Sequence, residues 1–300
     1  MELRIENLSK RYPNGTQALD SVSLTIPLGM FGLLGPNGAG KSTLMRTLAT
    51  LQEADSGKAF LDGMDVLKQK DAVRKVLGYL PQEFGLYPKV SAEDLLSHFA
   101  ALKGIADSKE RRETVSALLH QTNLYDHRRK ALGSFSGGMK QRFGIAQALI
   151  GNPRLIIVDE PTAGLDPEER VRFHNLLSAI GEDVIVILST HIVSDVSDLC
   201  SSMAIIHEGR VLVAGEPQAL VAKLEGQVWR KSIAQSEVAG QRERFRVISM
   251  RLFAGRTLIH VLNEKQPEAG FDPVVPDLED LYFATIRGFL YGAPAPARAS

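Results

Sequence analysis

The feature that most constrains the fold of this chain is a glycine-rich stretch with a lysine near its end. The stretch follows the apolar segment Met30–Leu34, which we expect to be a buried strand, and precedes a segment with helical spacing. Its glycines let backbone N–H groups point inward, and a helix start adds the positive end of its dipole. Strand, loop and helix in this order indicate a P-loop that binds a phosphorylated nucleotide. The residues of the predicted loop are Gly35, Pro36, Asn37, Gly38, Ala39, Gly40, Lys41, Ser42 and Thr43.

Two side chains of this loop have distinct expected tasks. Lys41 supplies a positive charge for the β and γ phosphates of ATP, and the hydroxyl of Ser42 can ligate Mg²⁺. A dinucleotide-binding fingerprint fits poorly, because Thr43 occupies the place of its third glycine and Lys41 has no task in it. We therefore expect ATP and Mg²⁺ as ligands. A glycine-rich turn with a purely structural role is the alternative.

A pair of acids follows a second apolar run. Asp159 and Glu160 come directly after Leu155–Val158, so we expect both at the carboxyl edge of the sheet, where ligands bind in open α/β folds. Asp159 fits a magnesium-associated acid, and Glu160 can polarise a water molecule for attack on the γ phosphate. Acids also end strands without any function. The functional interpretation depends on the presence of Lys41 upstream.

A second helix start has the residues of an anion site. Ser136 precedes Gly137 and Gly138 at the start of a helix predicted to reach Ile150, and a serine cap with exposed glycine N–H groups can hold a phosphate. A well-capped helix without a ligand explains the same residues. A spare phosphate site would have a task if two copies paired about a two-fold axis.

The hydrophobic pattern divides the chain. Over residues 1–224 short apolar runs alternate with segments of helical spacing, which predicts an α/β domain with a largely parallel sheet. Within it, residues 83–150 are expected to form a helical subdomain. Residues 225–291 read as a small appendage with a β-hairpin and a final helix, and the Ala/Pro-rich tail 292–300 is expected to be disordered. The predicted strands are Glu2–Asn7, Val22–Ile26, Met30–Leu34, Ala59–Leu61, Leu155–Val158, Val184–Leu188, Arg246–Phe253 and Thr257–Leu262. The predicted helices are Gly40–Leu51, Ala92–Leu102, Arg111–Thr122, Gly137–Ile150, Glu168–Ile180, Pro217–Leu224 and Leu278–Ile286.

Composition excludes several classes of function. The 300 residues contain 35 basic and 35 acidic side chains, so no global basic excess favours nucleic acid. The single Cys200 rules out an intramolecular disulfide and a cysteine cluster for a metal. No apolar run approaches the roughly 18 residues of a membrane span. If the protein acts at a membrane, we expect another chain to cross it.

Taken in order, these motifs resemble the nucleotide-binding domain of the ABC transporter family over about residues 2–220. The resemblance implies a P-loop NTPase of ABC type: an α/β fold with a mostly parallel core sheet, an antiparallel β part at the N-terminus, a helical subdomain and a small α+β C-terminal appendage. The matching motifs are the loop at 35–43, Phe135-Ser-Gly-Gly-Met139, Asp159-Glu160-Pro161, Leu-Pro-Gln82-Glu, Ala-Gly-Leu-Asp166 and Ser-Thr-His191, with Tyr12 ahead of them.

The resemblance implies further site residues. Tyr12 stands where the family has the aromatic that stacks on adenine, and Gln82 where a glutamine links magnesium to the transport partner. Asp166 matches a loop that crosses the dimer interface, and His191 a histidine at the γ phosphate. The same residues also fit simpler tasks: a strand aromatic, a solvated loop residue, a helix cap at Asp166 and a histidine that ends a strand. Phe135 and Met139 depart from the usual Leu and Gln of the family.

The function implied is the ATPase subunit of a transporter, at the cytoplasmic face of the membrane. Its expected partners are an integral membrane permease on a separate chain and a second copy of itself or a homologous ATPase subunit, joined head to tail. The extension with Leu278–Tyr282 resembles those of ABC-2-type exporter ATPases.

The apolar residues Phe84, Leu86 and Tyr87 can be a docking site for the permease or ordinary core. The alternatives are a non-transport ABC ATPase that acts on nucleic acid or the ribosome, and a P-loop kinase, although we expect no nucleic acid.

Overall fold

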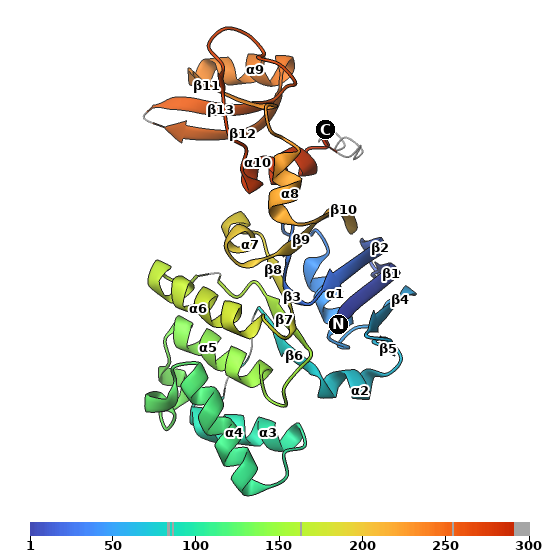
Figure 1. Cartoon of the computed structure of the whole chain (residues 1–300), viewed down its shortest axis with the longest axis vertical. Helices are drawn as coiled ribbons and strands as arrows, with labels where there is room; N and C mark the ends of the chain where they lie inside the picture. The colour runs from blue at the N-terminus through green and yellow to red at the C-terminus, as the bar shows by residue number, and fades with distance from the viewer. Residues whose placement is uncertain (83–84, 86, 163, 254, 291–300) are drawn as a thin grey trace.

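A central parallel sheet organises the protein, whose structure is a computed structural model that describes residues 1–82, 85, 87–162, 164–253 and 255–290. The six strands lie in the order β10-β9-β3-β8-β7-β6 (Figure 1). All neighbours are parallel except β10, which runs antiparallel to β9. The strands are β3 (Gly29–Leu34), β6 (Leu77–Leu80), β7 (Leu155–Asp159), β8 (Ile185–Thr190), β9 (Ser202–His207) and β10 (Arg210–Gly215).

The expected parallel sheet is confirmed. Every residue of β7 and β8 is buried, because helices or strands cover both faces of the sheet. On one face, α1 (Lys41–Leu48) lies between the central sheet and an antiparallel sheet of order β2-β1-β4-β5, and their apolar side chains form one cluster (Figure 1). The antiparallel strands are β1 (Glu2–Arg11), β2 (Gln17–Pro27), β4 (Ser56–Leu61) and β5 (Met64–Asp65).

The opposite face of the sheet packs against α6 (Pro167–Ile180) and α7 (Val193–Leu199). Beyond it, α3 (Ala92–Leu102), α4 (Ser108–Gln121) and α5 (Gly137–Ala148) share a separate apolar cluster at one end of the molecule (Figure 1). The remaining short elements are α2 (Lys70–Lys75), η1 (Tyr125–His127), η2 (Leu132–Ser134), α8 (Pro217–Ala222) and η3 (Gln235–Glu237).

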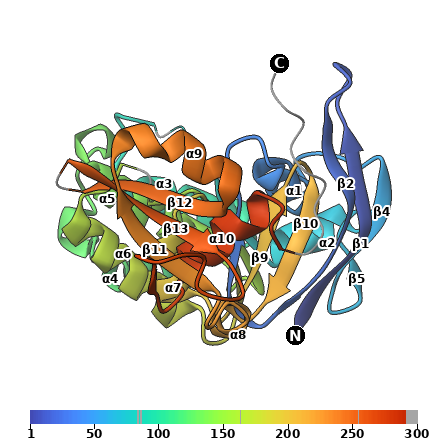
Figure 2. The ribbon, with the colours of Figure 1, turned by 90° about the horizontal axis from the view of Figure 1, so that it is seen from above.

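The C-terminal residues form a third sheet, of order β12-β13-β11-β14. It lies at the other end of the molecule, and Figure 2 shows it on the side of α6 and α7 rather than over β1 and β2. The final helix α10 contacts α7, α8, β9 and β12, so it joins this sheet to the main body. These elements are β11 (Val228–Ile233), α9 (Val238–Arg244), β12 (Arg246–Phe253), β13 (Arg256–Leu262), β14 (Asp272–Pro273) and α10 (Leu278–Ile286).

Several element boundaries differ from those expected. The helix after the glycine-rich loop ends at Leu48 rather than Leu51, because Thr50 has the left-handed φ of 62°. Helix α4 begins three residues early, where the side chain of Asp107 accepts hydrogen bonds from two backbone N–H groups. Within the described residues no helix is long and apolar enough to cross a membrane. Phe84, Leu86 and the tail 292–300 lie outside them.

Candidate nucleotide-binding site

The glycine-rich loop connects β3 to α1 and keeps the helix start open. A Cβ at Gly35 would lie 2.3 Å from the carbonyl oxygen of Ile206, and one at Gly40 would lie 2.4 Å from that of Ala18. Gly40 also has a φ of 104°, which favours glycine. No side chain caps α1, so the first N–H groups of the helix remain available to an anion.

Lys41 is turned inward against its own loop. Its side chain is 4% exposed, and its Nζ donates to the carbonyl oxygens of Gly35 at 2.7 Å and Pro36 at 3.2 Å. The same Nζ lies 3.3 Å from Oε1 of Glu160. The buried ammonium therefore has a carboxylate as its counter-ion.

Glu160 is the meeting point of the predicted catalytic residues. Its Oε2 accepts a hydrogen bond from Nε2 of Gln82 at 3.3 Å and lies 3.3 Å from Nδ1 of His191, while Oε1 faces Lys41. The backbone N–H of Glu160 donates to the carbonyl oxygen of Ser189 at 2.9 Å, which fixes the strand end against β8. The structure thus brings together Lys41, Gln82, Glu160 and His191.

The predicted magnesium ligands are oxygen donors close to this centre. Asp159 is 3% exposed, and its Oδ1 accepts a hydrogen bond from Oγ of Ser189 at 2.8 Å. Ser42 is the second residue of α1, next to Lys41. Ser42 and Gln82 both line the cavity that lies in front of the loop. Hydroxyl, amide and carboxylate oxygens are the donors that Mg²⁺ prefers, so the residues fit this ion.

A cavity of about 460 Å³ lies in front of the loop. At its rim the hydroxyl of Tyr12 lies 3.2 Å from Oγ1 of Thr43 and donates to Oε1 of Gln52 at 2.9 Å, which fixes the ring at the wall. The wall of the cavity therefore contains both the phosphate loop and an aromatic side chain. Its lining residues are Tyr12, Thr16, Ala18, Pro36, Asn37, Gly38, Ala39, Gly40, Lys41, Ser42, Thr43, Gln82 and Glu160.

The second predicted phosphate site is not part of this cavity. Ser136 caps α5, and its Oγ accepts a hydrogen bond from the N–H of Met139 at 3.2 Å. Asp166 caps α6 and accepts from the N–H of Glu169 at 2.8 Å, which confirms its capping role. Neither Ser136 nor its glycines nor Asp166 lines the cavity. Within one chain, the loop at 35–43 and the helix start at Ser136 therefore do not line a common cavity.

The structure adds residues that the sequence interpretation missed. Ser189 holds Asp159, and a buried Asp195 gathers polar side chains beside the site. The sequence around Asp195 repeats the triplet Val-Ser-Asp over residues 193–198, which is also typical of a solvated helix, so no pattern identified Asp195. The sequence offers one indication that Asp195 belongs near the site, which is that it follows His191 by four residues.

Comparison with known proteins identifies the family. A family model described as ABC transporter matches residues 19–163. The ATP-binding protein YxlF of Bacillus subtilis is 30% identical over 300 residues, which cover 95% of this chain and 99% of that protein. The chain belongs to the family of ABC transporter ATP-binding proteins.

Other relatives of this ABC family member differ in length. The linearmycin resistance ATP-binding protein LnrL of Bacillus subtilis is 33% identical over 86% of this chain and 80% of its own length. The probable multidrug ATP-binding protein YbhF of Escherichia coli is 32% identical over 95% of this chain. The chain spans 52% of that protein's length.

Solved structures of ABC proteins confirm the fold class. The ATP-binding cassette MJ0796, a dimer bound to ADP and Pi, has a TM-score of 0.65 and 26% identity, over 71% of this chain and 98% of that one. An ATP-binding subunit of an ABC transporter has a TM-score of 0.66 and 28% identity, over 74% of this chain and 93% of that one. The expected P-loop NTPase fold of ABC type is therefore confirmed.

Proposed function

We propose that this ABC protein is the ATP-hydrolysing subunit of an exporter whose membrane permease is a separate chain. The observation that supports hydrolysis is the placement of Glu160 within 3.3 Å of Lys41, Gln82 and His191 at the mouth of the nucleotide cavity. Export is supported by relatives named for resistance to linearmycin and to daunorubicin and doxorubicin. The permease would hold the protein at the cytoplasmic face of the membrane.

The chemistry follows from the side chains in the cavity. ATP displaces the Lys41 ammonium from Glu160, and Lys41 then holds the β and γ phosphates. The freed carboxylate of Glu160 takes a proton from water as the water oxygen bonds to the γ phosphorus. The bond from that phosphorus to the bridging oxygen breaks, which leaves ADP and phosphate. Bound Mg²⁺, held by Ser42, Asp159 and Gln82, would neutralise phosphate charge.

His191 and Tyr12 have supporting tasks in this proposal. The imidazole of His191 faces the carboxylate of Glu160. In this proposal it donates a hydrogen bond to the γ phosphate. The ring of Tyr12, which lines the cavity, stacks on the adenine base. The loop residues Gly35 to Thr43 hold the phosphates through their backbone.

Two chains complete each site in this proposal. Ser136, Gly137 and Gly138 do not line the cavity of their own chain, so in this proposal they serve the nucleotide of a second copy. Asp166 begins α6 and would lie at the interface between the two copies. ATP then joins the copies head to tail, and its hydrolysis releases them.

A single substitution tests hydrolysis. Glu160→Gln keeps the shape of the side chain but removes the base, so we expect ATP binding to persist while turnover falls by about 100-fold or more. Glu168→Gln is the matched control, because Glu168 is an exposed carboxylate on α6. A native turnover rate in Glu160→Gln would overturn the assignment of the base.

Co-purification tests the transport assignment. The full-length protein, expressed with its neighbouring genes and extracted in detergent, should bring down a polytopic membrane protein, which mass spectrometry identifies. Recovery of ribosomes or DNA in its place would reject transport. Of the three apolar residues considered for docking, the structure describes Tyr87, which is 63% exposed and available for contact with a permease.

A further inference from the structure

A fully buried carboxylate lies outside the lining of the nucleotide cavity. Asp195 belongs to α7 and has no exposed surface, and it does not line the cavity. A buried carboxylate is costly unless several donors compensate it, and well-packed apolar residues often stabilise a core equally well. The residues that donate hydrogen bonds to Asp195 therefore indicate the role of this buried charge.

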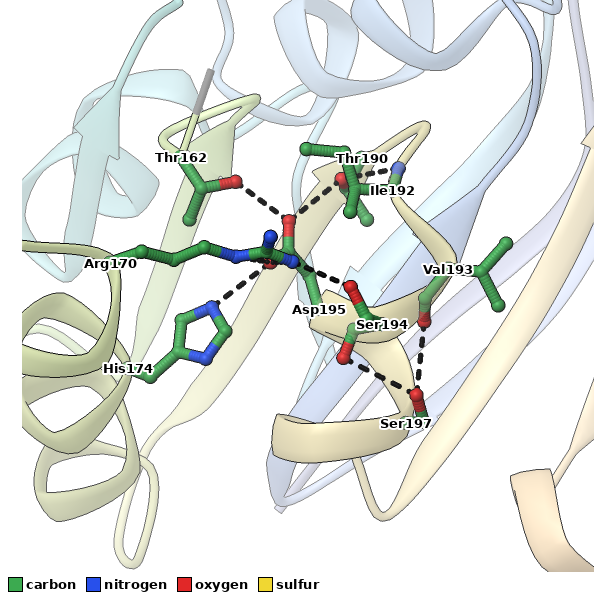
Figure 3. A network of polar contacts seen from close by, with 9 residues as sticks. All are labelled: Thr162, Arg170, His174, Thr190, Ile192, Val193, Ser194, Asp195 and Ser197. Carbon is green, nitrogen blue, oxygen red and sulfur yellow. Dashed lines mark hydrogen bonds and ion pairs between the residues drawn. The ribbon is translucent and has the colours of Figure 1, made fainter. Parts of the chain in front are cut away.

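One oxygen of Asp195 holds the two segments that contain the catalytic side chains. Oδ2 accepts hydrogen bonds from Oγ1 of Thr162 at 2.7 Å and from Oγ1 of Thr190 at 3.1 Å (Figure 3). Thr162 follows Glu160 by two residues, and Thr190 directly precedes His191. Both hydroxyls are buried, so water does not replace these bonds.

The segment of His191 is held from both sides. Oγ1 of Thr190, which donates to Asp195, also accepts a hydrogen bond from the backbone N–H of Ile192 at 2.9 Å (Figure 3). The backbone of His191 thus lies between two residues fixed by one hydroxyl. The imidazole, 45% exposed, is free to meet a ligand while its backbone is fixed.

The other oxygen of Asp195 holds helix α6. Oδ1 accepts from Nε and Nη2 of Arg170 at 3.0 and 2.6 Å and lies 3.0 Å from Nε2 of His174 (Figure 3). Nη2 of Arg170 also donates to Oγ of Ser194 at 2.7 Å. Helix α6 begins at the cap residue Asp166, so the same carboxylate connects this helix to the catalytic segments.

We propose that Asp195 is a positioning residue for hydrolysis, which sets the backbones of Glu160 and His191 relative to helix α6. The inference rests on the proposed roles of Glu160 and His191. The carboxylate acts as a rigid bridge: one oxygen fixes the two catalytic segments, and the other fixes the helix that begins at Asp166. Its loss misplaces the base and leaves the phosphate loop intact, because the bridge meets that loop only through the backbone of Thr190. The carbonyl oxygen of Thr190 accepts a hydrogen bond from the N–H of Gly35 at 3.4 Å, and this bond does not involve the Thr190 side chain.

The first test separates turnover from binding. Asp195→Asn turns one acceptor into an N–H donor that faces other donors, so we expect kcat to fall by about 10- to 100-fold. We expect the Kd for ATP to change by less than about threefold. Asp198→Asn, at an exposed aspartate of the same helix, is the matched control and should keep the native kcat. An unchanged kcat in Asp195→Asn would overturn the proposal.

The second test asks whether Asp195 acts through Glu160. In a Glu160→Gln background the base is already lost and only the contribution of His191 can still fall, so Asp195→Asn should lower the residual rate by a factor at least about threefold smaller than its effect on the native rate. Single-turnover release of phosphate measures this rate. The same fold-loss in both backgrounds would show a merely structural role. A native rate in Glu160→Gln alone would contradict the proposed function and not the need for Asp195.

A third variant decides the question if Asp195→Asn does not fold. Thr162→Val removes one donor to Oδ2 without changing charge, and we expect kcat to fall by about fivefold. Thr122→Val is its control, because Thr122 is equally buried and hydrogen-bonded but lies at the end of α4. Native kcat in Thr162→Val, or an equal loss in the control, would reject the proposal.

Discussion

The ammonium nitrogen of Lys41 lies 3.3 Å from a carboxylate oxygen of Glu160, and both side chains are largely removed from water. Without nucleotide, the base of the proposed reaction is thus the counter-ion of the lysine that must bind the phosphates. In the proposed reaction, ATP and Glu160 therefore compete for Lys41. The carboxylate becomes free to accept a proton only after a phosphate has replaced it, which couples activation of the base to occupancy of the site.

This competition predicts that Glu160→Gln binds ATP more tightly than the native chain. Removal of the carboxylate leaves Lys41 without a charged partner, so we expect Kd to fall by about fivefold, or ~1 kcal/mol. Equilibrium binding of a fluorescent ATP analogue to the monomeric chain measures it. The exposed Glu168→Gln should leave Kd unchanged, and an equal Kd in both variants would exclude the competition.

The loop geometry predicts that Gly35→Ala abolishes ATP binding. Its Cβ would lie 2.3 Å from a backbone carbonyl oxygen, so the loop must shift from the positions that face the phosphates. We also expect a loss of stability of about 1–3 kcal/mol. Gly240→Ala is the control, because nothing lies within 4 Å of the new methyl group in α9 and alanine favours a helix. Calorimetry with ATP distinguishes the two.

The position of Tyr12 predicts that the base contributes to the affinity for ATP. Tyr12→Ala removes the aromatic wall of the cavity and should weaken ATP binding by about 1–3 kcal/mol, while Tyr12→Phe keeps most of the affinity. Inorganic triphosphate has no base, so its affinity should be the same in all three chains. If Tyr12→Ala lost triphosphate as well, the residue would support the loop through Thr43 rather than bind adenine.

Burial predicts an unreactive thiol at Cys200. Desolvation, with a smaller contribution from the charge of Asp195, raises the pKa of this thiol to about 12. The unfolded chain loses the proton near pH 9 and the folded chain does not, so the thiol's contribution to stability is lost as pH rises from about 9 to 12. At pH 9 we expect iodoacetamide to label Cys200 in urea and not in the native state, as mass spectrometry can show. Equal labelling would contradict burial.

Local chemistry was predictable from the sequence wherever adjacent residues define a site. The loop from Gly35 to Thr43 and the caps at Ser136 and Asp166 are continuous in the chain, so their residue types identify them. The strands β9 and β10 were missed, as was β6, although all three are rich in apolar residues. Their runs are short, and periodicity alone does not separate a short buried strand from other apolar segments.

Contacts between distant segments were not predictable. The approach of Gln82 to Glu160 joins residues from two different strand ends, and only the sheet order brings them together. Asp195 was missed because its burial depends on Arg170 and His174 from another helix. A sequence shows the residue type at such positions, whereas the pairing of strands and helices decides which side chains meet.

The separation of Ser136 from the nucleotide cavity of its own chain has a genetic consequence. In the head-to-tail dimer proposed above, an allele with Lys41 replaced and an allele with Ser136 replaced complement each other. In each mixed dimer one site combines both damaged halves, and the other combines both intact halves. At equal expression about half of the dimers are mixed, so about a quarter of full activity returns. An allele with both replacements rescues neither of the single ones.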